Sequence, residues 1–193
     1  MRFASCLALL AFGVAACSNV VSESADRSAG AGSDDKEVVN LDGLKSPAPA
    51  EWKKEAPANK MRFAQFRLPK QKDDKNDAEL ILFRDLGGSA KQNVERWKQQ
   101  FQPPEGKKID DVAKVTEIKI GGRTATLLDV QGIYLFKTRP FDPADKGEKR
   151  PDYRMLAIHF DGPDHLYHIK LTGPAKTVEY YQKGFDEWLK NFK

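Results

Sequence analysis

The chain has few cysteines and no long apolar run. Two of its 193 residues are cysteine, which is too few for a disulfide scaffold. No segment approaches the roughly 18 consecutive apolar residues of a membrane-spanning helix, which excludes a polytopic membrane protein. Glycine and proline, with 14 and 11 residues, are too scarce for a collagen-like or low-complexity chain. The 32 Lys and Arg residues nearly balance the 28 Asp and Glu residues, so we expect one soluble domain rather than a highly charged disordered chain.

Serine and cysteine are almost absent from the larger part of the chain. Beyond Ala50 there is no cysteine, and Ser89 is the only serine. Because covalent catalysis by these residue types needs an exposed hydroxyl or thiol beside a base, Ser89 is the one candidate nucleophile. Its position at the start of a predicted helix favours a role as the helix cap. These absences argue against an ordinary serine or cysteine hydrolase, and we predict no catalytic residue.

What the chain does have is an N-terminus typical of exported proteins. Residues 1–16 begin with one positive charge, Arg2, and continue as an apolar stretch that ends in small residues, which predicts a signal peptide. The run VAAC at residues 14–17, followed by Ser18, resembles the bacterial lipobox, with Val14 where Leu is more usual. The resemblance implies that Cys17 is lipidated and anchors the chain to a membrane. A plain secretory signal and an uncleaved anchor are the alternatives.

The sequence divides into three predicted parts. Residues 1–16 form the lipoprotein signal peptide, residues 17–50 the acylated cysteine and a flexible tether, and residues 51–193 a single globular domain. The tether is rich in Ser, Ala, Gly, Asp and Pro, which bury too little apolar surface to offset the entropy of ordering. The one exception that we expect is a short strand at Val38, Val39 and Leu41 that docks onto the domain. Residues 51–193 carry 28 basic and 22 acidic residues, which favours attraction to anionic envelope surfaces.

Hydrophobic periodicity beyond residue 51 predicts six strands and two helices. Strands are expected over residues 61–68, 78–85, 115–120, 124–136, 153–161 and 165–172. Ser89 and Gln92 form a capping box for a helix to about residue 102, and Gly173 and Pro174 open a helix to about residue 191. This order indicates an α+β fold, an antiparallel β-sheet of about six strands flanked by two main helices. The polar stretch 137–152, with three prolines, predicts a long mobile loop.

All three histidines lie on the last predicted hairpin. Pairing Asp161 with Asp164 makes His168 the diagonal neighbour of His159 on one face and places His165 on the other face. Two imidazoles roughly 5–7 Å apart can share a metal ion, and Asp161 is a conceivable third ligand. Because no compact metal motif accompanies the pair, solvated strand histidines are the preferred interpretation. We therefore predict no metal and no cofactor, with His159 and His168 as the metal-ligand candidates if a site exists.

Several segments resemble known bacterial proteins. The runs WKKEAPANKMRFAQFRLPK, GGRTATLLDVQGIY and LTGPAKTVEYYQKGFDEWLKNF resemble a group of uncharacterised bacterial lipoproteins, and the order of strands and helices is similar to that of the PsbP-like superfamily. The resemblance covers about residues 52–193 and implies a PsbP-like α/β/α sandwich. By analogy it implies a binding or assembly role without catalysis. It does not imply a role in photosynthesis, because no cofactor-binding motif of the photosystem subunit is matched.

Two functional interpretations remain open at this point. The preferred one is a lipid-anchored, non-catalytic module that binds an unknown envelope protein or polymer, with the outer membrane facing the periplasm favoured because Ser18 follows the cysteine. The alternative is an envelope enzyme or metal-binding protein that uses the face with His159 and His168. Nucleic-acid binding is not expected, because basic and acidic residues alternate rather than cluster.

Overall fold

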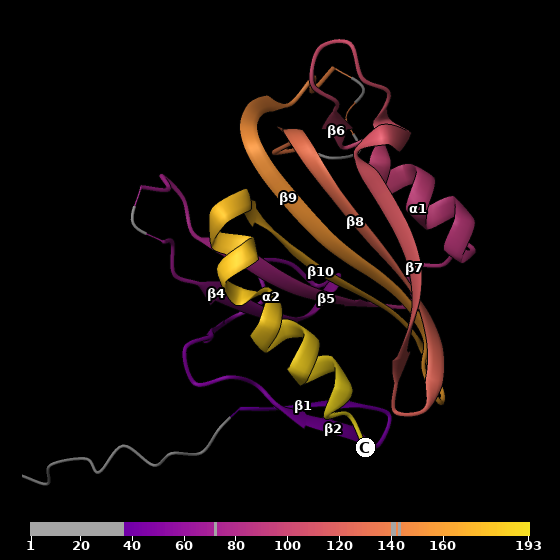
Figure 1. Ribbon diagram of the computed structural model, residues 1–193. Helices are drawn as coiled ribbons and strands as arrows, with labels where there is room; N and C mark the ends of the chain where they lie inside the picture. The colour runs from indigo at the N-terminus through magenta and orange to yellow at the C-terminus, as the bar shows by residue number, and fades with distance from the viewer. Residues whose placement is uncertain (1–36, 72, 140–141, 143) are drawn as a thin grey trace, which may run out of the picture. The chain divides into compact units, whose positions relative to one another are not determined.

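An antiparallel sheet with one helix on each face organises the folded part of the chain (Figure 1). The computed structural model describes residues 37–71, 73–139, 142 and 144–193. The predicted signal peptide and Cys17 lie outside the described residues. The strands are β1 (Val38–Leu41), β2 (Leu44–Pro47), β3 (Lys53–Glu55), β4 (Arg62–Leu68), β5 (Ala78–Arg84), β6 (Phe101–Gln102), β7 (Ala113–Ile120), β8 (Arg123–Phe136), β9 (Glu148–Asp161) and β10 (Leu166–Pro174). The helices are α1 (Ala90–Lys98), the 3-10 turn η1 (Ile109–Asp111) and α2 (Ala175–Lys190).

Eight strands form the main sheet in the order β3-β4-β5-β10-β9-β8-β6, and β7 also pairs with β8. All of their pairings are antiparallel. The predicted α+β fold with an antiparallel sheet and two main helices is therefore confirmed. The six predicted strands and the expected short strand β1 are present, and the short strands β2, β3 and β6 add to them.

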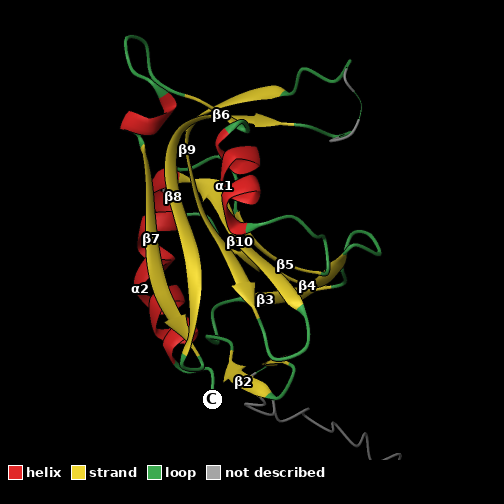
Figure 2. Ribbon diagram, turned by 90° about the vertical axis from the view of Figure 1, so that its right-hand side faces the viewer, coloured by secondary structure: helices red, strands yellow, loops and turns green. Residues whose placement is uncertain are grey.

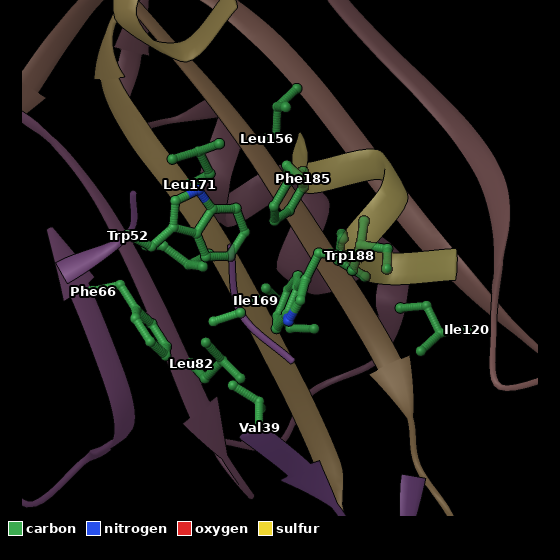
Figure 3. Close-up of a cluster of buried hydrophobic side chains, with 14 of the residues drawn as sticks. Val39, Trp52, Phe66, Leu82, Ile120, Leu156, Ile169, Leu171, Phe185 and Trp188 are labelled. Carbon is green, nitrogen blue, oxygen red and sulfur yellow. The ribbon is translucent and has the colours of Figure 1, made fainter. Parts of the chain in front are cut away.

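Each face of the sheet has its own apolar core, because side chains alternate between the faces along a strand. On β9, Leu156, Ile158 and Phe160 point toward α2, while Met155 and Ala157 belong to the core under α1. Figure 2 shows the two helices on opposite faces. Helix α2 turns one apolar stripe toward this core, with these members buried: Val178, Tyr181, Phe185, Trp188 and Leu189; Phe192, just after the helix, is buried as well. Figure 3 shows Trp52, Phe185 and Trp188 in the larger core.

The folded unit begins before residue 51, so the predicted tether does not extend to residue 50. Strands β1 and β2 form a hairpin whose two-residue turn, Asp42 and Gly43, has φ values of 54° and 94°. Asp-Gly is a preferred sequence for such a turn. Val39, Leu41, Ser46 and Ala48 are buried, and the hydroxyl of Ser46 donates to the carbonyl of Trp188 at 2.8 Å. The hairpin thus packs against α2 and belongs to the domain, and Val38–Leu41 is the docked strand that was expected.

Helix α1 ends earlier than predicted. The sequence indicates a helix to about residue 102, but α1 stops at Lys98 with Gln99 as its C-cap. Phe101 and Gln102 form β6 instead, where Phe101 pairs with Tyr134 and is 5% exposed. Phe101 is therefore buried through a strand contact rather than a helical one.

The predicted loop 137–152 is also shorter than expected. Strand β9 already begins at Glu148, and Arg150 pairs with Tyr134 on β8. The guanidinium of Arg150 lies 3.7 Å from the ring centroid of Phe136, a cation–π contact that favours continued strand pairing. The charge-rich composition of residues 137–152 predicted a loop. The aromatic residues on β8 that Arg150 contacts lie outside this segment, so its composition alone did not indicate a strand.

The predicted register of the last hairpin is wrong by two residues. Asp161 pairs with Leu166 rather than with Asp164, and His159 lies directly opposite His168. A two-residue shift leaves every side chain on its predicted face, because side chains alternate with a period of two. The pattern of apolar residues therefore predicted the faces correctly and could not distinguish the two registers.

Candidate functional site

Two buried histidines are in contact on the face of the sheet that α1 covers. His159 on β9 is 6% exposed and His168 on β10 is 2% exposed. The Nδ1 atom of His159 lies 3.2 Å from the Nε2 atom of His168. At this distance one ring nitrogen donates a hydrogen bond to the other. The sequence placed the two residues on one face, and the structure brings them closer than the predicted diagonal arrangement.

Helix α1 positions the residues around this pair. Its start is the predicted capping box: the Ser89 hydroxyl accepts from the backbone N–H of Gln92 at 3.3 Å, and the Gln92 side chain accepts from the N–H of Ser89 at 2.9 Å. The Ser89 hydroxyl and the Gln92 side-chain amide are therefore both hydrogen-bonded to backbone N–H groups, and Ser89 is the N-cap of α1. Further along the helix, Trp97 meets the ring of His168 edge-on, with centroids 5.3 Å apart.

Asn93 ties the start of α1 to the histidines. It is 1% exposed, and its amide nitrogen donates to the carbonyl oxygens of Gly87, Gly88 and Ser89 at 3.0–3.2 Å. The same nitrogen lies 3.4 Å from Nδ1 of His159. Asn93 was not recognised from the sequence, although an Asn in the first helical turn is a common sign of backbone hydrogen bonding.

Burial keeps both histidines neutral at neutral pH. Burial, followed by unfavourable electrostatic interactions with His159, Arg96 and Lys170, lowers the pKa of His168 from 6.5 to about 4. Burial also lowers the pKa of His159, against the opposing charge of Asp161. Removing an imidazolium from water is unfavourable, so the neutral pair with one shared hydrogen bond is the stable form.

His165 belongs to a different place in the fold. Its Nδ1 atom donates to Oδ1 of Asp42 at 2.7 Å, and the hydroxyl of Tyr167 donates to the same oxygen at 2.8 Å. Asp42 lies in the turn of the β1–β2 hairpin. His165 therefore holds the N-terminal hairpin to the β9–β10 turn. It lies apart from His159 and His168, consistent with its predicted position on the other face.

The histidine pair does not recruit further metal ligands. Within the described residues, no three His, Cys, Asp or Glu side chains come together as a metal would need. Asp161, the conceivable third ligand, lies 3.7 Å from Nε2 of His159, and its side chain is 81% exposed.

A half-buried lysine occupies the same face, one row further along β10. Lys170 lies opposite Ala157 on β9 and Ile81 on β5. Its ammonium donates to Oε1 of Gln100, just after α1, at 3.0 Å. Burial, together with the charges of Arg96 and Arg62, outweighs the opposing charge of Glu79 and lowers the pKa of Lys170 from 10.5 to about 8. A perturbed titratable group beside other charges is a common mark of a functional site.

Arg62 and Glu79 border this lysine on β4 and β5. The guanidinium of Arg62 donates from Nη1 to Glu79 Oε1 at 2.5 Å and to Gln65 Oε1 at 2.6 Å. Gln65, which is 7% exposed, donates in turn to Glu55 at 3.0 Å. The Nε atom of Arg62 is buried and has no hydrogen-bond partner among the described residues. We call Lys170, Arg62, Arg96 and Glu79 the Lys170 cluster.

The Lys170 cluster was not recognised from the sequence. Alternation along β10 puts Lys170 on the same face as His168, but a lysine in an exposed strand position gives the same pattern. Ile169 and Leu171 face the opposite side of the sheet, so their alternation with Lys170 gives no signal for the cluster. Arg62 and Arg96 come from elements distant in sequence, and no local pattern links them.

Surface hollows occur elsewhere on the domain. One, of about 450 Å³, lies on the solvent side of α2 and is lined by Glu179, Lys183 and Asp186 among others. Another, of about 430 Å³, lies beside the ion pair of Asp129 and Arg154. Both are open and lined by charged side chains, and neither includes the histidine pair or Lys170. Among the described residues, neither helix is long and apolar enough to cross a membrane.

Comparison with known proteins yields structural similarity only. No protein-family model matches the sequence, and no curated protein matches it. The chain is similar to PA94 from Pseudomonas aeruginosa, a protein of unknown function, with 15% identity, a TM-score of 0.44 and coverage of 78% of this chain and 91% of that one. It is also similar to the cyanobacterial PsbP protein CyanoP from Synechocystis sp. PCC 6803, with 12% identity, a TM-score of 0.47 and coverage of 81% and 89%.

Proposed function

We propose that the protein is a lipid-anchored cell-envelope protein of a PsbP-like lipoprotein group, whose folded unit acts as a non-catalytic binding or assembly module. The binding surface is the face of the sheet that carries α1. The partner is an envelope protein or polymer. The sequence of the first 18 residues supports the lipid anchor at Cys17, and the Lys170 cluster supports the location of the binding surface.

The Lys170 cluster is the observation that carries this assignment. Helix α1 packs mainly against β8 and β9, while Lys170, Glu79 and Arg62 lie on β10, β5 and β4. Two cationic side chains and one carboxylate therefore lie on a part of the sheet beside the helix, and Arg96 on α1 adds a third cation. Lys170, Arg62 and Glu79 are half-buried, and Arg96 is exposed. A surface with several preoriented polar groups next to an apolar core is typical of recognition sites.

In-cell photocrosslinking tests the binding surface. A photoreactive amino acid replaces Arg96, which is exposed on α1, and in a matched variant it replaces Tyr180, which is 62% exposed on α2. The expected result is a discrete adduct from position 96 that position 180 does not give. Equal adducts from both positions, or none from position 96 under conditions in which the control photoreaction works, would contradict the proposed surface.

The lipid anchor has its own test. Replacing Cys17→Ser removes the thiol that would carry the lipid, whereas Cys6→Ser changes a residue of the predicted signal peptide. We expect the Cys17 variant to leave the membrane fraction and the Cys6 variant to stay in it. Retention of both variants in the membrane fraction would show that the anchor is not this lipid.

A second candidate function is transition-metal binding by His159 and His168. Two nitrogen ligands of one tetrahedral zinc ion lie about 3.3 Å apart, close to the observed separation of 3.2 Å. The described residues add no third His, Cys, Asp or Glu to the pair, which is why we prefer the binding module. Zinc titration by calorimetry distinguishes the two, with His168→Ala as the site variant and His165→Ala as the control. An unchanged titration in the His168 variant would remove this candidate.

A further inference from the structure

We propose that the Lys170 cluster binds an oxyanion group, a phosphate or a carboxylate, with Lys170 as the central cation and Arg62 and Arg96 beside it. This inference rests on the proposed binding function and names the chemistry that the surface recognises. This oxyanion group is part of the partner molecule that binds the face of the sheet that carries α1.

The position of Lys170 sets it apart from the other lysines of the sheet. Its neighbours on β10, Ile169 and Leu171, are both fully buried in the opposite core. On its own face it lies beside Ala157, whose methyl group leaves the ammonium free to extend toward the end of α1. There it meets the side-chain oxygen of Gln100 at 3.0 Å.

The charge of Lys170 has no carboxylate partner. Among the described residues, no Asp or Glu oxygen lies within 4.0 Å of its ammonium, and Gln100 is the one hydrogen-bond acceptor found for it. An ammonium has three N–H donors, so the observed contact leaves two of them available. A partly desolvated cation without an anionic partner is unfavourable, and an incoming oxyanion would supply the missing acceptors.

The two arginines come from different elements, Arg62 from β4 and Arg96 from α1, and both charges act on Lys170. Arg62 is 19% exposed in its side chain, and its Nε–H is buried without a partner among the described residues. Arg96 bonds through Nη2 to Oδ1 of Asn93, which holds the guanidinium against α1. Guanidinium groups bind carboxylates and phosphates through two parallel hydrogen bonds, whereas an ammonium acts as a point charge.

Glu79 is the one acidic member of the cluster and competes with the ligand. Its carboxylate accepts from Arg62 and occupies part of that guanidinium. It lies near enough to Lys170 to raise the pKa of the lysine, while the two arginines act in the opposite sense. The cluster therefore carries an excess of positive charge, and removing the carboxylate should strengthen anion binding.

Lysine labelling measures occupancy of the site directly. The full-length chain, purified in detergent, reacts with acetic anhydride at about pH 8, where a lysine with a lowered pKa is partly deprotonated. Acetylation of Lys170 and of Lys114, an exposed lysine on the edge strand β7, is then quantified by mass spectrometry. The probes are inorganic phosphate and acetate, each compared with chloride at equal ionic strength.

We expect the anion to protect Lys170 and not Lys114. At an anion concentration ten times the dissociation constant, labelling of Lys170 should slow about tenfold. Protection by phosphate alone assigns the site to phosphate groups, and protection by acetate as well assigns it to oxyanions generally. Protection that is equal at the two lysines, or absent at both, would overturn the inference.

Three variants provide a second measurement that does not depend on labelling. Lys170→Met keeps the length and apolar stem of the side chain, and its phosphate affinity, followed by thermal shift, should fall at least about tenfold. Lys114→Met removes the same charge from the edge strand and should bind phosphate like the parent. Glu79→Gln should bind it several-fold more tightly. An unchanged affinity in the Lys170 variant contradicts the inference, whereas the crosslinking result at position 96 would still stand or fall on its own.

Discussion

Asp42 joins the N-terminal hairpin to the rest of the domain, and replacing it with Asn tests that role. Its carboxylate accepts four hydrogen bonds: from the Tyr167 hydroxyl, from Nδ1 of His165, and from the backbone N–H groups of His165 and Asp164, all between 2.7 and 3.1 Å. Asp42 also has a φ of 54°, a conformation that Asn tolerates about as well as Asp. The Asp42→Asn variant therefore keeps the turn and removes the charge and one acceptor oxygen.

The expected loss of stability follows from the pKa of this carboxyl. Burial acts to raise the pKa of Asp42, but the four hydrogen bonds outweigh it and lower the value from 3.8 to about 2. A shift of that size corresponds to up to about 2.4 kcal/mol of folding free energy at neutral pH. Because the turn lies near the surface and solvent screens part of the interaction, we expect about 1–2 kcal/mol. The melting temperature should fall by roughly 2–8 °C.

Chemical denaturation of the full-length chain at several pH values is the assay. The pKa of Asp42 is lower in the folded state than in the unfolded state, so its contribution is complete above about pH 4 and is lost as the pH falls toward about 2. The difference in unfolding free energy between the parent and Asp42→Asn should therefore be constant from pH 7 to about pH 5 and shrink below about pH 4.

Asp152→Asn is the matched control. Asp152 is exposed and has a similar φ of 55°, so it undergoes the same chemical change in the same backbone conformation. We expect this variant to stay within about 0.5 kcal/mol of the parent. Equal losses in the two variants, or a difference for Asp42→Asn that does not change between pH 5 and pH 3, would refute the reasoning.

Three further predictions concern α1 and the histidine pair. Because the pKa of His168 is lowered to about 4 in the folded state, unfolding free energy should fall as the pH drops from about 6.5 to 4, and His168→Gln should flatten that slope in denaturation experiments. Trp97→Ala should cost about 3–5 kcal/mol by calorimetry because the side chain is 2% exposed, whereas the exposed Tyr180→Ala should cost less than about 0.5 kcal/mol. Ser89→Ala should lower stability by about 1 kcal/mol and Ser89→Asn should restore it; no restoration would argue against the cap.

Local patterns predicted most of the secondary structure. The strands β4, β5, β7, β8 and β10 and the helix α2 were expected within a few residues of their bounds, because each buries apolar side chains at the period of its own element. The Ser89 cap was expected for the same kind of reason, since donor and acceptor lie within one turn of helix. The hairpin β1–β2 carried a readable signal too: Asp42-Gly43 between apolar strands is a strong turn sequence, and it was outweighed by the polar composition of the segment around it.

The register of the last hairpin shows why some features escaped prediction. The four residues from Gly162 to His165 close the turn with a backbone hydrogen bond of 2.9 Å, and Asp42 accepts from the N–H groups of Asp164 and His165. The residue that secures this turn thus lies more than 120 positions away in the sequence. Both candidate registers place the same side chains in the core, so only this distant contact separates them.

By itself, the sequence determined the class of the fold, the faces of the strands and the apolar stripe of α2, because these depend on periodicity within single elements. It also contains the lipobox-like run around Cys17, which leads to the proposed lipid anchor. Only the tertiary structure decided that His159 and His168 touch, that residues 37–50 are folded, and that Lys170 meets Gln100 near the charges of Arg62 and Arg96. Those residues lie on strands and a helix that are far apart in the chain. The distances between their side chains are therefore set by how these elements pack and not by any local sequence pattern.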